Sequence, residues 1–73
     1  MTLETEKPDK LKILLEIHGL LSMHKITQFE LARHLGVSVV SVNNWLKSEP
    51  VTTYDNLYAM IDAAREIITE KAQ

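Results

Sequence analysis

The sequence predicts a small all-α domain, a compact bundle of four to five helices around one core. Four stretches carry apolar residues at helical spacing, and none shows the strict alternation of a strand. Both prolines and Gly36 lie at the edges of these stretches, where such residues begin or end helices. A chain of 73 residues has room for one domain. We expect it to extend over 9–71, after a flexible N-terminus (1–8) and before a short tail (72–73).

The two longest helices are predicted at the ends of the chain. The first runs from Pro8 or Asp9 to Met23, and its apolar residues cover more than half of the helix circumference. A helix that packs on a single core needs a narrower apolar stripe. The additional apolar surface therefore indicates deep burial or a second contact surface. Gly19 should cost this helix up to ~1 kcal/mol relative to alanine. The last helix runs from Thr52 or Thr53 to about Lys71, with an acidic ridge of Asp62, Glu66 and Glu70.

A complete helix start signal precedes the second helix. Thr27 and Glu30 have the spacing of a capping box, in which each side chain accepts a hydrogen bond from the other residue's backbone N–H. The helix should begin at Gln28 and end near Leu35. Gly36 is expected to end it in the left-handed conformation.

The third helix shows a similar start signal. Ser38 is a favourable N-cap, and Val37 with Val42 has the spacing of a hydrophobic staple. The helix should run from Val39 to about Lys47, because Pro50 disfavours helical geometry in the residue before it.

The second and third helices together fit a helix-turn-helix at 28–47. That motif needs a small residue where the helices cross and a glycine in the turn. Counting from Gln28, Ala32 is fifth and Gly36 is ninth. The apolar places that hold the helices together are filled by Leu31, Leu35, Val37, Val42, Trp45 and Leu46.

The outer face of the third helix has the chemistry of a surface that reads DNA. It carries Val40, Asn43, Asn44 and Lys47, with Val39 at its border, and no acidic residue. Asparagine can pair with adenine through two hydrogen bonds, and an aliphatic side chain can pack on a thymine methyl group. Lys47 suits a phosphate.

Further phosphate contacts are expected from the second helix and the turn before it. Gln28 can contact a phosphate or brace the third helix, at a helix N-terminus that favours an anion. Lys25, Arg33 and His34 are the other candidates. For Arg33, a plain surface charge is an equal alternative.

Residues 27–38, with Val42 and the pair Trp45–Leu46, resemble the lambda-repressor-like (Cro and xenobiotic-response-element) helix-turn-helix family. The resemblance covers about Leu11 to Ile67. It implies a lambda-repressor-like bundle, in a family made up mostly of phage or bacterial transcription regulators that act as dimers. It assigns base reading to Ser38, Val39, Val40, Asn43 and Asn44, and a phosphate contact to Gln28. A short Cro-like repressor, acting on a near-palindromic operator of double-stranded DNA, is the nearest type.

Charge and the surplus apolar surface bear on this interpretation. The formal net charge of -2 counts against nucleic-acid binding, which needs a positive surface. Residues 28–50 carry two acids and two bases, whereas residues 51–73 carry four acids and two bases. The excess acid therefore lies outside the predicted binding unit. We expect a homodimer, which doubles the DNA contacts, with an interface at Leu20, Ile67 and Ile68.

Several of these residues admit other interpretations. Trp45 can stack on a base, but its phase with Val42 favours the core. The three histidines lack metal-ligand spacing, and no nucleophile signature indicates an enzyme. We expect no metal, cofactor or small-molecule ligand. Without cysteine, disulfides and thiolate metal sites are excluded. Because we find no apolar span and no signal-peptide pattern, we expect a cytoplasmic protein.

A second function stays open. The chain's acidity favours a protein-interaction module that keeps the helix-turn-helix fold, such as an antirepressor or an antitoxin-type partner. The acid-free face of the third helix favours DNA.

Overall fold

The computed structural model describes residues 8–72, which form four α-helices. These are α1 (Lys10–Met23), α2 (Gln28–Leu35), α3 (Val39–Trp45) and α4 (Tyr54–Lys71). The described part of the chain contains no strand, so the all-α prediction is confirmed with four helices. Most of the predicted flexible N-terminus lies outside the described residues. No helix within 8–72 is long and apolar enough to cross a membrane.

Each helix begins behind a side chain that accepts a hydrogen bond from the first turn. Asp9, Thr27, Ser38 and Thr53 are the four N-caps, and all four backbones are extended at the cap. The capping box of α2 is complete, with Thr27 and Glu30 bonded in both directions at 3.0 and 3.1 Å. The predicted starts of α2 and α3 are thus confirmed, whereas α1 begins at Lys10 and α4 at Tyr54, each one residue after the later of the two predicted positions.

The ends of α1 and α2 use the same backbone device. Gly36 adopts φ 74°, and Val37 N–H then donates to Ala32 O at 3.0 Å. Lys25 adopts φ 54° at the equivalent place after α1, and Ile26 N–H donates to Leu21 O at 2.8 Å. This is the Schellman arrangement, usually built on glycine. The sequence predicted it at Gly36 but not at Lys25.

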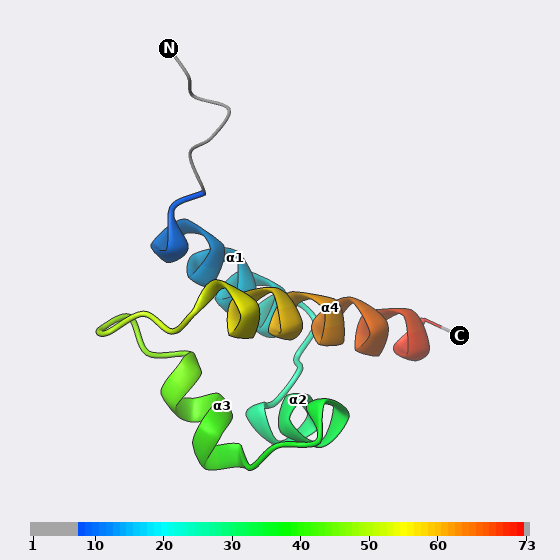
Figure 1. The fold of residues 1–73 in the computed structure, drawn as a ribbon. Coiled ribbons are helices and arrows are strands. Elements are labelled where there is room, and N and C mark those ends of the chain that lie inside the picture. The colour runs from blue at the N-terminus through cyan, green and yellow to red at the C-terminus, as the bar shows by residue number, and fades with distance from the viewer. Residues whose placement is uncertain (1–7, 73) are drawn as a thin grey trace.

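Helices α1 and α4 lie side by side and run in the same direction, with α2 and α3 on one side of them (Figure 1). Their starts are joined by Tyr54 Oη, which donates to Pro8 O at 2.6 Å. Helix α2 packs on both α3 and α4 and so connects α3 to the rest of the bundle. One core results, formed by Ile13, Leu14, Ile17, Leu21, Ile26, Leu31, Ala32, Val42, Leu46, Leu57, Met60, Ile61, Ala63, Ala64 and Ile67.

The core includes one residue of the predicted dimer interface. Ile67 belongs to it, with only 6% of its surface exposed. Leu20 and Ile68 are half-buried and pack against the same core. Much of the surplus apolar surface is therefore explained by burial within one chain. What remains exposed on α1 is a different set of residues, Leu11, Leu15 and Met23.

Candidate nucleic-acid interface

Helix α3 is held firmly although it has only seven residues. At its start, Ser38 Oγ accepts from Ser41 N–H at 3.1 Å. Val42 is fully buried, Leu46 belongs to the core and Trp45 packs against it, as predicted for all three. The contacts of the inner face of α3 therefore fix the position of its outer face.

A hydrogen bond that no sequence signal indicated anchors the other end of α3. His18 Nε2–H on α1 donates to Leu46 O at 2.9 Å. Leu46 is the C-cap of α3, where carbonyl groups lack partners within the helix. A polar side chain 28 residues away in sequence thus satisfies one of them. The helix ends at Trp45, two residues before the predicted Lys47, and Pro50 follows in the loop.

The outer face of α3 contains the predicted residues in exposed positions. Val40 has 69% of its surface exposed, and Val39 lies at the border with 37%. Asn43, Asn44 and Lys47 are also exposed. No acidic residue lies between Val39 and Lys47, so this surface presents two amides, aliphatic carbon and one positive charge.

Ser38 has a structural task that the family resemblance did not assign. Besides accepting from Ser41 N–H, its hydroxyl donates to Ser41 Oγ at 3.0 Å. A hydroxyl has one donor, so its remaining capacity for a base is a single acceptor lone pair. Its contribution to the candidate interface is chiefly the placement of α3.

Gln28 braces α3, which was one of the two roles considered for it. Asn43 Nδ2 donates to Gln28 Oε1 at 3.2 Å, across the junction between α2 and α3. The amide NH2 of Gln28 and Oδ1 of Asn43 stay available for a ligand. The pair links the start of α2, where backbone N–H groups favour an anion, to the middle of the α3 face.

The candidate phosphate ligands have different surroundings. Lys25, Arg33 and Lys47 are exposed, and the side chains of Lys25 and Lys47 make no ion pair among residues 8–72. Arg33 lies close enough to Glu30 to help lower its pKa. His34 does not join this group, because its Nε2 lies 2.6 Å from Glu66 Oε1 on α4.

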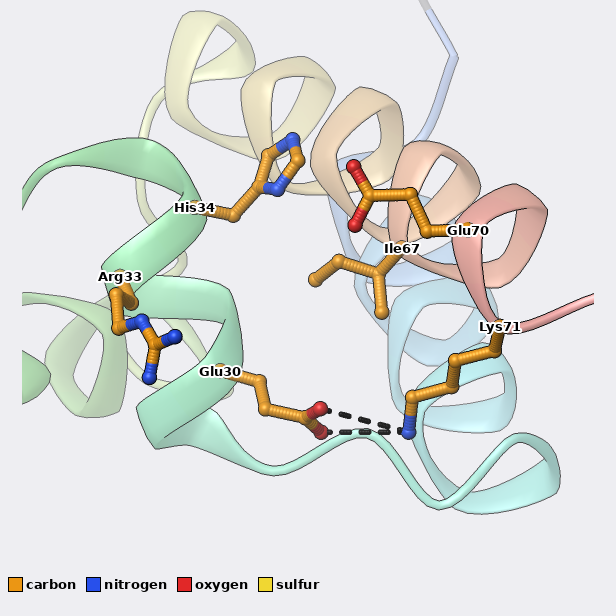
Figure 2. A pocket seen from close by; sticks show the side chains of 6 residues that line it. All are labelled: Glu30, Arg33, His34, Ile67, Glu70 and Lys71. Atoms are coloured by element: carbon orange, nitrogen blue, oxygen red, sulfur yellow. Dashed lines mark hydrogen bonds and ion pairs between the residues drawn. The ribbon is translucent and has the colours of Figure 1, made fainter. Parts of the chain in front are cut away.

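A shallow hollow lies between α2 and α4, next to these pairs (Figure 2). Lys71 reaches from α4 to Glu30, 3.5 Å from its carboxylate oxygens, and Glu70 points into the same space. The pKa of Glu30 is lowered chiefly by the hydrogen bond from Thr27 N–H, with smaller contributions from Lys71 and Arg33. The hollow mixes both charge signs around Ile67, and its ion pair between Glu30 and Lys71 connects α2 to α4.

The acidic ridge is also part of this contact. Glu66 contacts His34, Glu70 lines the hollow, and Asp62 is exposed on α4. One residue of the predicted acidic ridge therefore bonds α2, and the ridge is less uniform than its spacing suggested.

No protein-family model, no curated protein and no solved structure matches the chain. The candidate interface is therefore argued from its own residues.

Proposed function

We propose that residues 28–47 act as a helix-turn-helix that binds double-stranded DNA in a sequence-specific manner, with the outer face of α3 in the major groove. The observation that carries this proposal is the acid-free amide and aliphatic face of α3 in a chain whose net charge is -2. A face selected only for solubility would carry some of the acids that α4 has in excess. The proposed function is that of a transcription regulator of the Cro-like repressor type.

The way α3 is held supports base reading. A helix that reads bases must present its side chains in a fixed geometry. If the side chains are mobile in the free protein, ordering them on binding costs conformational entropy and weakens the complex. Here the N-cap at Ser38, the buried Val42 and the His18 bond at the C-cap fix α3 at three points.

The chemistry of the face favours A·T base pairs. Asn44 can pair with adenine N6 and N7, and the exposed Val40 can pack on a thymine methyl group. Guanine is most often read by arginine, and no arginine lies on α3. We expect the preferred half-site to be rich in A·T where Val40 and Asn44 contact it.

The alternative is a protein-interaction module with a basic partner. It is favoured by α4, whose Asp55, Asp62 and Glu70 are exposed. In that function the α3 face would be a protein contact and DNA affinity would be absent.

Selection from a pool of random duplexes at low salt tests the proposal, followed by fluorescence anisotropy on the enriched sequence and a scrambled control. We expect enrichment of a site with A·T positions and tighter binding to it than to the control. DNA from directly upstream of the gene is a second probe. Lack of enrichment together with lack of binding to any duplex at low salt would reject DNA binding and favour the basic partner.

A further inference from the structure

The turn between α1 and α2 is bonded to the last residue of α4. Lys71 Nζ lies 3.5 Å from each carboxylate oxygen of Glu30, and it donates to the backbone carbonyl of Lys25 at 3.5 Å. These contacts join residues 41 and 46 positions apart in sequence, and Figure 2 shows Lys71 reaching from α4 to Glu30 on α2. One ammonium group therefore connects α4 to both the turn and the first turn of α2.

Glu30 extends this connection to a second point of the turn. The carboxylate oxygen Oε1, which faces Lys71, also accepts the hydrogen bond from Thr27 N–H at 3.1 Å. The backbone of the turn is thus bonded at the carbonyl of Lys25 and at the N–H of Thr27. Both bonds depend on the pair that Glu30 forms with Lys71, so this pair fixes the turn relative to α2 and α4.

The charges around the turn are divided unequally. Lys71 contacts the backbone of Lys25 and the carboxylate of Glu30, so this carboxylate lies close to the turn. It is paired with Lys71, whereas the side chain of Lys25 makes no ion pair among residues 8–72. Without Lys71, the carboxylate would be free to attract the Lys25 ammonium group. Lys71 thus leaves the charge of Lys25 available for another anion.

We propose that Lys71 is a positioning residue for DNA binding, which neutralises Glu30 and holds the turn so that Lys25 can contact a phosphate of the DNA backbone. This inference rests on the proposed function, in which Lys25 is a phosphate ligand. Lys71 acts through Lys25, because its own ammonium group already contacts Glu30 and the carbonyl of Lys25. A residue of α4, outside the helix-turn-helix, would then determine one of its phosphate contacts.

Lys71 should matter more for DNA affinity than for folding. The side chains of Lys71 and Glu30 are 43% and 39% exposed, and an exposed ion pair contributes little to the stability of a fold. A phosphate contact forms only in the complex, so its loss appears in the affinity for DNA of any sequence. Lys71→Ala should therefore stay folded, and should bind the selected and the scrambled duplex about threefold more weakly or worse.

Arg65→Ala and Lys71→Arg are the matched controls. Arg65 is exposed on α4, so its replacement removes the same charge from the same helix without disturbing the turn. Arginine at position 71 keeps both the charge and the hydrogen-bond donors. We expect Arg65→Ala to lose less affinity than Lys71→Ala, and Lys71→Arg to bind like the wild type. Equal losses in Lys71→Ala and Arg65→Ala would overturn the inference, since the effect would then follow net charge alone.

A double-mutant cycle with Lys25→Ala distinguishes positioning from direct contact. If Lys71 acts through Lys25, Lys71→Ala should cost no more in the Lys25→Ala background than Arg65→Ala costs there. If Lys71 instead contacts DNA by itself, its replacement will cost the same in both backgrounds, and the inference is then wrong. Anisotropy titrations of the single and double variants with the selected duplex, at one salt concentration, give this comparison.

Amide hydrogen exchange of the free protein gives a result that does not depend on DNA. Lys71→Ala should raise the exchange rate of Thr27 N–H, because its acceptor Glu30 loses a partner, and should leave Ser41 N–H on α3 unchanged. An unchanged rate at Thr27 would overturn the inference. If only DNA binding is wrong, exchange at Thr27 will rise while no duplex is enriched. If only the positioning is wrong, a duplex will be enriched and Lys71→Ala will bind it like Arg65→Ala.

Discussion

Asn43 and Asn44 are adjacent on α3 and carry the same amide, yet their surroundings differ. Asn43 donates to Gln28, so part of its hydrogen-bonding capacity is already used. The Asn44 side chain makes no hydrogen bond within residues 8–72, and it is exposed. Asn43 keeps one N–H and its Oδ1 but is held by Gln28, whereas Asn44 keeps its whole amide for the two-bond contact with adenine.

Asn44→Ala should cost about 1–3 kcal/mol of binding free energy on the selected duplex and little on a scrambled one. The loss is confined to the selected duplex because only base contacts distinguish the two. Anisotropy titration of both duplexes measures it, with Ser22→Ala, an exposed change on α1, as the control. Equal affinity of Asn44→Ala and wild type for the selected duplex would show that α3 reads it by other residues.

The backbone conformation of Lys25 destabilises the fold, whereas its side chain is a candidate for binding DNA. Its φ of 54° places a side chain in the left-handed region, which costs a non-glycine residue about 1–2 kcal/mol. Its exposed ammonium group is a candidate phosphate ligand. Gly36 fills the equivalent place after α2 without this cost.

Lys25→Gly should raise the free energy of unfolding by up to about 1 kcal/mol, because the relief of backbone strain exceeds the greater entropy of glycine in the unfolded chain. It should also weaken DNA binding by removing a positive charge. Urea denaturation of Lys25→Gly beside Lys25→Ala isolates the backbone effect, since both lose the charge and only glycine relieves the strain. A glycine variant no more stable than the alanine variant would contradict the argument.

At the scale of the helices, the stability of the start of α2 depends on whether one carboxyl group, that of Glu30, is ionised. Glu30 closes the capping box, and the N–H of Thr27 lowers its pKa below the usual 4.5. The folded pKa is thus below the unfolded one. The stabilisation is complete above the unfolded value and is lost as the pH falls through the folded value.

Glu30→Gln should keep the capping geometry but remove this titration, because glutamine accepts the same hydrogen bond without ionising. Its free energy of unfolding should be lower than that of the wild type at neutral pH, where Lys71 also attracts Glu30. The difference should shrink as the pH falls below about 4.5. Urea denaturation curves at a series of acidic pH values give the free energies of unfolding of both proteins. A difference between them that stays constant with pH would mean that the substitution acts through packing and not through ionisation.

Local signals explain which parts of the fold were predictable. Thr27, Ser38 and Gly36 act through hydrogen bonds or backbone conformations within a few residues, so their spacing reveals them, and the starts of α2 and α3 were predicted correctly. The left-handed turn at Lys25 was missed because lysine carries no preference for it. The end of α3 was placed late because Pro50 marks only the last residue a helix can reach, whereas α3 stops at Trp45.

The side chains of the candidate site divide in the same way. Exposure of Val40, Asn43 and Asn44 follows from helical phase opposite the buried Val42, and was predicted. The pairs His18–Leu46 and His34–Glu66 join residues 28 and 32 positions apart, and helical phase within one element cannot predict them. For the same reason Ile67 was assigned to the dimer interface and not to the core, since its burial depends on where α4 lies.

For the whole molecule, the distribution of charge matters more than the sum of -2. Two acidic residues near the candidate interface already have partners: Glu30 pairs with Lys71, and Glu66 pairs with His34. The acid-free surface of α3 leads to Lys47, directly after the helix. A phosphate near the end of α3 would thus meet a positive charge with no acidic residue between Val39 and Lys47 to offset it.

Lys47→Ala should therefore weaken binding to selected and scrambled duplexes alike, and should reduce the slope of log affinity against log salt by about 1. Removal of one phosphate contact releases one counterion fewer, whatever the base sequence. Anisotropy over a series of salt concentrations measures the slope for both duplexes. Arg65→Ala removes the same charge from an exposed position on α4, so a slope that falls equally in both variants would mean that α3 does not direct the contact with DNA.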